Sequence, residues 1–143
     1  MLEDTDSVLN DPSVRAVVQS AWLDSNPGVA GGHEEGGFVL RDSTGTLSVL
    51  RWPSGEGNAI SVPPHRGCKL GDREIVATFH THPNTGSDYI QGPSETDRRA
   101  VRDDPDLKGA FYKGEFVISN DRIYRIDKDG VVHETAETAH LFD

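Results

Sequence analysis

The sequence contains a single cysteine, Cys68, among its 143 residues. One cysteine excludes an internal disulfide and every metal site built from several thiolates. The chain also lacks the Pro-Cys-x-x-Cys pair of zinc nucleoside deaminases, which argues against that class of enzyme. We expect Cys68 to be a buried, unreactive thiol, because a reactive cysteine needs an activating environment.

Long apolar runs and basic residues are also scarce. No stretch approaches the roughly eighteen apolar residues that a membrane-spanning helix needs, and the acidic N-terminus lacks the features of a secretory signal. We therefore expect a cytoplasmic protein with no membrane segment. Lysine and arginine number 14 against 24 acidic residues, which gives a net charge of −10. Such a chain repels phosphate backbones, so we expect no nucleic-acid partner.

The length suits one domain with its own core, over residues 1–143 with the core at about 11–135. We expect an irregular start at residues 1–10. Asp11 and Pro12 predict the cap and first turn of a helix that continues to residue 23. Alternating or apolar runs predict strands, and Ser94 predicts the start of a second helix over residues 95–101. The predicted fold class is α+β, a mixed and mostly antiparallel sheet flanked by helices, with strands at 38–41, 47–52, 59–62, 74–82, 114–119, 122–126 and 131–133.

The segment His-Thr-His-Pro at residues 80–83 is the most informative feature that is present. It follows the apolar run 75–79, and side chains alternate between the two faces of a strand. His80 and His82 are therefore predicted to point the same way at the strand end, and Pro83 stops the strand because it lacks an N–H group. Two imidazoles in this arrangement suit a zinc ion.

A third ligand and a base can be assigned to acidic residues on either side of these histidines. Asp97 falls in the first turn of the helix that Ser94 begins, where a loop can bring its carboxylate to His80 and His82. These three side chains leave a fourth position of a zinc site open for water. Glu34, before the glycine pair at 36–37, is predicted to act as the general base.

Each motif also has a purely structural interpretation. Histidines near strand ends are common without a metal, and Ser-x-x-Asp is also the pattern of a helix capping box. The conjunction of the motifs in this order favours the metal site. His33, Glu35 and Asp88 are polar candidates for contacts that support the site, but we expect them to be exposed loop side chains. We assign no role to the histidines at 65, 133 and 140.

The order Glu, His-x-His-Pro and Ser-x-x-Asp resembles the JAMM motif of the JAB/MPN superfamily of zinc metallopeptidases. Residues Glu34, His80, His82, Ser94 and Asp97 match that motif, and Glu-Glu-Gly-Gly at 34–37 resembles its Glu-x-x-Gly, which favours Glu34 over Glu35. The likeness covers about residues 33–126. The stretch between His82 and Asp97 is longer than usual, as in a bacterial branch of the superfamily.

This resemblance implies a JAB/MPN fold, which is cytidine-deaminase-like, a Zn²⁺ cofactor and hydrolysis of a peptide or isopeptide bond. Expected partners are protein or peptide substrates, including the tail of a ubiquitin-like protein. Ser94 is then expected to donate to the oxyanion, and Tyr89 and Ile90 are predicted to form one wall of a substrate groove. Two alternatives stay open: a zinc amidase for a small molecule or peptidoglycan fragment, and a non-catalytic binding scaffold of the same fold.

Overall fold

The computed structural model describes residues 7–28, 31–86 and 91–142. Tyr89, Ile90 and Asp88 lie outside these ranges. The helices are α1 (Ser7–Asn10), α2 (Pro12–Asp24) and α3 (Glu95–Arg102). The strands are β1 (Gly36–Arg41), β2 (Leu47–Arg51), β3 (Lys69–Leu70), β4 (Arg73–His82), β5 (Glu115–Ser119), β6 (Arg122–Ile126) and β7 (Val132–Glu137), and short 3₁₀ helices cover Arg66–Cys68, Pro105–Leu107 and Thr138–Phe142.

One mixed sheet of seven strands organises the described chain. Its strand order is β2-β1-β4-β5-β6-β7, with β3 paired to the start of β4. Every neighbouring pair is antiparallel except β4 and β5, which are parallel. The predicted class, an α+β domain with a mixed and mostly antiparallel sheet, is therefore confirmed.

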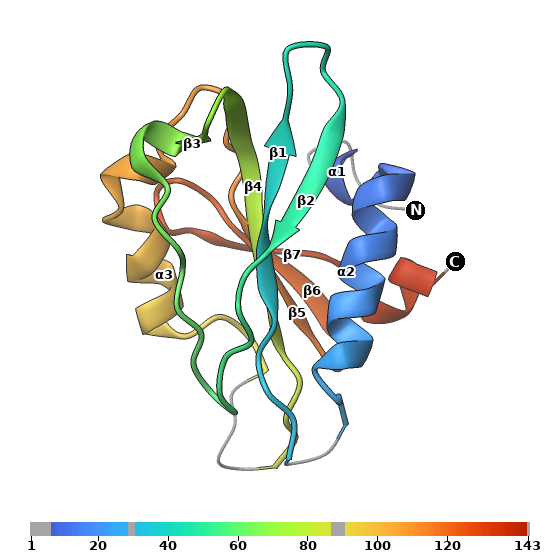
Figure 1. The fold of residues 1–143 in the computed structure, drawn as a ribbon. Helices are drawn as coiled ribbons and strands as arrows, with labels where there is room; N and C mark the ends of the chain where they lie inside the picture. The colour runs from blue at the N-terminus through green and yellow to red at the C-terminus, as the bar shows by residue number, and fades with distance from the viewer. Residues whose placement is uncertain (1–6, 29–30, 87–90, 143) are drawn as a thin grey trace.

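Helices cover both faces of this sheet (Figure 1), with α2 on one side and α3 on the other. Because side chains alternate along a strand, two apolar clusters form. The cluster under α2 includes Val39 and Phe79, and the cluster toward α3 includes Phe38 and Val117. His80 and His82 share the α3 face with Thr78, so the site lies between the sheet and α3.

The predicted start of α2 is confirmed in detail. The Asp11 carboxylate accepts hydrogen bonds from the backbone N–H groups of Ser13 and Val14, and Pro12 occupies the first turn. The expectation of an irregular start at residues 1–10 is wrong for Ser7–Asn10, which form α1. Leu9 is buried there, and Leu141 is buried near the other terminus, so the core extends beyond 11–135.

The predicted strand at residues 59–62 is also wrong. This segment is irregular, because it bends through a turn in which the Glu56 N–H donates to the Ala59 carbonyl at 2.7 Å. Proline at 63 and 64 then removes two donors that a ladder would require. The segment between β2 and β3 runs beside α3 (Figure 1) and forms a wall of the site. The last strand is longer than predicted, Val132–Glu137 in place of 131–133.

Cys68 is buried, as predicted. Burial raises the pKa of its thiol, which disfavours the reactive thiolate.

Candidate metal centre

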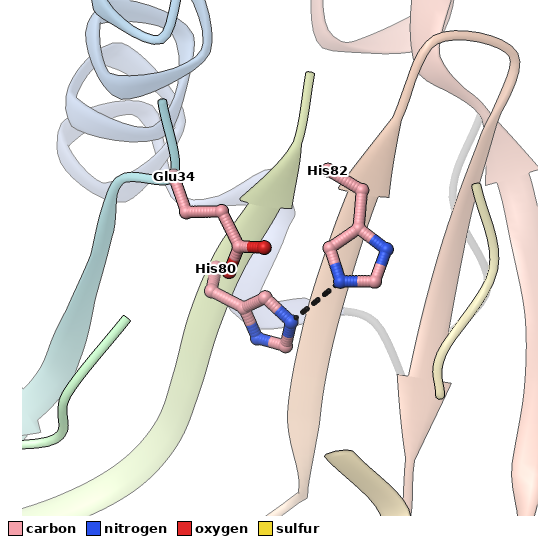
Figure 2. Close-up of side chains that lie close together, drawn as sticks. All are labelled: Glu34, His80 and His82. Carbon is pink, nitrogen blue, oxygen red and sulfur yellow. Dashed lines mark hydrogen bonds between the residues drawn. The ribbon is translucent and has the colours of Figure 1, made fainter. Parts of the chain in front are cut away.

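The two histidines lie at the end of β4, on its α3 face, and both are buried. Their Nε2 atoms are 3.1 Å apart, and Figure 2 shows the rings turned toward each other. No hydrogen bond links two such nitrogens unless one of them carries a proton. A shared metal ion removes that requirement, because each neutral ring presents a lone pair to it.

Asp97 joins the histidines from the first turn of α3. Its Oδ1 lies 3.5 Å from His80 Nε2, and its Oδ2 lies 3.2 Å from His82 Nε2. Ligands of a tetrahedral zinc ion, each about 2.0–2.1 Å from the metal, lie about 3.3 Å from one another. The separation of the two histidine nitrogens is near that value. Asp97 approaches each ring with a different oxygen, so its carboxylate lies against the histidine pair without defining a single ligand position.

Glu34 comes from the segment just before β1. One ligand atom each from Glu34, His80 and His82 lie within 4.8 Å of one another, and Figure 2 shows the carboxylate beside the rings. Two backbone hydrogen bonds fix Glu34 to the segment after β2. Its N–H donates to the Glu56 carbonyl, and its carbonyl accepts from the Gly55 N–H. At this distance the carboxylate can act as a further ligand or hold a water molecule beside the metal.

Burial raises the pKa of Glu34, although the nearby histidines oppose that shift. A carboxylate of raised pKa exchanges protons more readily near neutral pH.

Glycine at 36 allows the backbone that follows Glu34 to pack closely against β4 and Trp52. A Cβ there would lie 2.4 Å from the Trp52 ring and 2.7 Å from the Phe79 carbonyl oxygen.

The expectation that Glu35 is an exposed loop side chain is wrong. Glu35 is buried, and its carboxylate accepts from Arg51 at 2.5 Å, from Ser54 at 2.5 Å and from the His33 ring at 2.6 Å. Only Glu34 of the adjacent pair has its carboxylate near His80 and His82. Glu35 instead anchors the segment that carries Glu34.

Ser94 and Asp97 form the capping box of α3. The Ser94 Oγ accepts from the Asp97 N–H at 3.0 Å, and the Asp97 carboxylate accepts from the Ser94 N–H at 2.9 Å. The capping interpretation of Ser-x-x-Asp is therefore confirmed, and the same carboxylate also faces the histidines. The hydroxyl proton of Ser94 is not used by the cap and is available to a ligand.

The ionisation of Asp97 and that of His80 depend on each other. Burial opposes ionisation of Asp97, but hydrogen bonds with His80 and His82 hold its pKa far below the ordinary range. Burial likewise opposes protonation of His80, but Glu115 and Asp97 outweigh it and raise its pKa well above the ordinary value. Asp97 and His80 therefore shift each other's pKa in opposite directions.

A second layer of residues fixes the orientation of both rings. His80 Nδ1 lies 2.8 Å from Glu115 Oε2, and His82 Nδ1 lies 3.2 Å from the Gln91 carbonyl oxygen. Both partners accept hydrogen bonds, so Nδ1 carries the proton in each ring and Nε2 is directed at the cluster.

Glu115 is held in turn by Thr78 at 2.9 Å, and Thr78 lies 2.7 Å from the Tyr112 hydroxyl. Sequence reasoning missed this chain of contacts. The available signal was a carboxylate at the start of an otherwise apolar strand, Glu115–Ser119.

Asn84 links three segments around the site. It is buried, its Oδ1 accepts from the Gly32 N–H at 2.7 Å, and its amide donates to the carbonyls of Gly32 and Gly57. The residue thereby ties the end of β4 to the segment that carries Glu34. Sequence reasoning gave it no role.

A cavity of about 460 Å³ opens beside the cluster. All five residues predicted for the site contribute to its lining. The lining comprises Glu34, Trp52, Gly57, Asn58, Ala59, Ile60, Val62, His80, His82, Asn84, Ser94, Thr96, Asp97, Ala100, Asp104, Leu107 and Glu115.

No family model, curated protein or solved structure matches the chain. Within the described residues, no helix has the length and apolar character required to cross a membrane. The chemistry of the site rests on its geometry.

Proposed function

We propose that the protein is a zinc-dependent hydrolase of peptide or isopeptide bonds, a metallopeptidase of the JAB/MPN type. The observation that carries this proposal is the cluster of Glu34, His80 and His82, whose ligand atoms lie within 4.8 Å of one another, with the Asp97 carboxylate against both rings. When bound, Zn²⁺ supplies a Lewis acid that polarises a carbonyl oxygen and acidifies a water molecule.

Glu34 takes the proton of the attacking water and delivers it to the departing amine, so a carboxylic acid and an amine are formed. Its buried position and raised pKa suit this exchange. The Ser94 hydroxyl, which lines the cavity, donates to the oxygen on which negative charge develops. The Glu115 and Gln91 contacts keep both rings oriented throughout.

A small-molecule or peptidoglycan-fragment amidase is the second candidate. The observation in its favour is the cavity of about 460 Å³, which lies within the roughly 300–1,000 Å³ range of small-ligand pockets. The same cavity can also receive one side chain of a peptide. A scaffold without activity is the weaker alternative, since the three ligand residues, the base and Ser94 are all present and brought together.

The test is hydrolysis by the zinc-loaded protein of three substrate groups: C-terminal extensions of ubiquitin-like proteins, isopeptide conjugates and small amides. Glu34→Gln, loaded with zinc in the same way, is the matched control. Cleavage by the parent and loss in the variant support the proposal, and the preferred group separates peptidase from amidase. Equal rates for parent and variant, or no cleavage in any group, would overturn it.

A further inference from the structure

The cavity continues beyond the metal cluster along α3. Thr96, Asp97 and Ala100 line it from the helix, and Asp104 lines it just past the helix end. At about 1.5 Å per residue, the helix rises roughly 7.5 Å from Asp97 to its end at Arg102, and Asp104 lies two residues farther along the chain. The cavity therefore has a metal-binding end at Asp97 and a second carboxylate at the other end of α3.

The walls between these two ends are largely aliphatic. Ile60 and Val62 contribute from the irregular segment, and Ala100 and Leu107 contribute from α3 and the turn after it. No lysine or arginine is among the lining residues that the structure describes. This part of the cavity suits an apolar stem and does not suit an anionic group.

Asp104 is held in place from behind. Its Oδ2 lies 2.6 Å from His65 Nε2, and its Oδ1 accepts from the Asp106 N–H at 2.8 Å. His65 Nδ1 lies 2.7 Å from the Pro63 carbonyl oxygen, which fixes the ring. His65 does not line the cavity. An ionised carboxylate has about four acceptor positions, so roughly two remain for a donor in the cavity.

We propose that this cavity binds a lysine or arginine side chain next to the scissile bond, with Asp104 as the residue that recognises its charge. The inference rests on the proposed hydrolase function and names its substrate class. An extended lysine stem reaches roughly 6 Å beyond its Cα, and the adjoining carbonyl adds roughly 2 Å more. A residue whose carbonyl lies at the metal cluster can therefore bring its ammonium group to Asp104.

The imidazole of His65 does not cancel this preference. His65 does not line the cavity, whereas an ammonium group in the cavity approaches the free acceptor positions of Asp104 directly. Coulomb energy falls with distance. The Asp104 carboxylate, which is nearer, therefore attracts the substrate ammonium group more strongly than the more distant His65 ring repels it. The aliphatic walls meanwhile cover the stem, as is usual for lysine and arginine in proteins.

The first measurement is kcat/KM of the zinc-loaded protein on matched amides that carry lysine, arginine, norleucine or glutamate beside the scissile bond. Norleucine has the lysine stem without the ammonium group. The parent should prefer lysine or arginine to norleucine by roughly 10- to 100-fold, the usual effect of a hydrogen bond to a charged group. Asp104→Asn should abolish that ratio. Asp103→Asn, which makes the same charge change at an exposed neighbour that pairs with Arg102, should keep it.

A second measurement does not depend on hydrolysis. Lysinamide and norleucinamide are titrated into the zinc-loaded parent, Asp104→Asn and Ala100→Leu, which narrows the cavity without touching the pair of His65 and Asp104. Lysinamide should bind the parent more tightly, and both variants should weaken it. Selective binding without cleavage of any amide would support the cation pocket and reject the hydrolase. Equal binding of lysinamide and norleucinamide would overturn the cation pocket. Equal cleavage of the lysine and norleucine amides would also overturn the pocket but would still support the hydrolase.

Discussion

Ser94 and Asp97 are hydrogen-bonded to each other twice at the start of α3, and Asp97 still faces both histidines. The cap fixes the Asp97 side chain before any metal arrives, so little conformational freedom remains to be lost on binding. One carboxylate therefore caps the helix and is also the proposed third ligand of the metal.

Replacing Ser94 should reveal both roles of this residue. Ser94→Ala removes a cap and should lower the free energy of unfolding by roughly 0.5–2 kcal/mol, whereas Ser94→Gly should cost only a few tenths. Both variants lack the hydroxyl, so both should reduce turnover by roughly 10- to 1000-fold. Thermal melts and kcat at saturating zinc separate the two effects. Turnover in the glycine variant equal to that of the parent would limit Ser94 to capping.

The sequence predicted correctly those element boundaries that depend on residues next to each other in the chain. Asp11 and Pro12 define the start of α2, and Pro83 follows the end of β4. The histidine pair is likewise local, because alternation along one strand is enough to align His80 with His82. Ser94 and Asp97 lie within a single helical turn.

The features that the sequence did not predict depend on contacts between distant segments. Glu115 reaches His80 only because β5 pairs in parallel with β4, and α3 intervenes between these strands. The segment 59–62 has the apolar character of a strand, yet it has no neighbouring strand and lines the cavity. Local pattern carries no information about either arrangement.

Metal content should follow the histidine pair at the end of β4. The purified protein should carry about one zinc ion per chain. Because His80 and His82 are two of the three proposed ligands, the double replacement by alanine should lose it. His133→Ala is the matched control, since that ring is half exposed and pairs with Asp127. Elemental analysis of the three proteins decides, and full zinc in the double variant would reject the site.

Glu115→Gln should weaken zinc binding without removing a ligand. Loss of the carboxylate behind His80 lowers the basicity and fixed orientation of that ring, and such replacements usually reduce metal affinity by about 10- to 100-fold. Tyr112→Phe, farther along the same chain of contacts, should have a smaller effect. Glu95→Gln, an exposed residue on α3, is the control. Competition with a chelator measures all four affinities, and an unchanged value in Glu115→Gln contradicts the positioning role.

The adjacent glutamates should respond differently to amide replacement. Glu34→Gln should retain zinc and lose roughly 10²-fold or more in kcat, because the base is gone. Glu35→Gln should instead lower the free energy of unfolding by roughly 1–3 kcal/mol, since Arg51 loses a charged partner. Activity assays on folded protein and denaturant titrations distinguish these outcomes. The reverse pattern would assign the base to Glu35.

The stabilisation of the fold by zinc should increase with pH, and the direction follows from the ligands. Glu115 and Asp97 raise the pKa of His80 in the metal-free fold, so its contribution to stability is present below the unfolded value of about 6.5 and is lost as pH rises through the folded pKa. The pKa of Asp97 is lowered, so its contribution is present above about 3.9 and is lost as pH falls through its folded pKa. The two groups together stabilise the metal-free protein most between these values.

A histidine binds zinc only in its neutral form, so protonation of the rings competes with the metal and binding weakens in acid. At a fixed concentration of free zinc, the rise in Tm over the metal-free protein should therefore be larger at about pH 7.5 than at about pH 5.5. Paired thermal melts with a zinc buffer at each pH measure this difference. The double replacement of His80 and His82 by alanine should show no rise at either pH. An equal rise in the parent at both values would exclude histidine ligation, because a ligand set of carboxylates alone keeps its charge across this range.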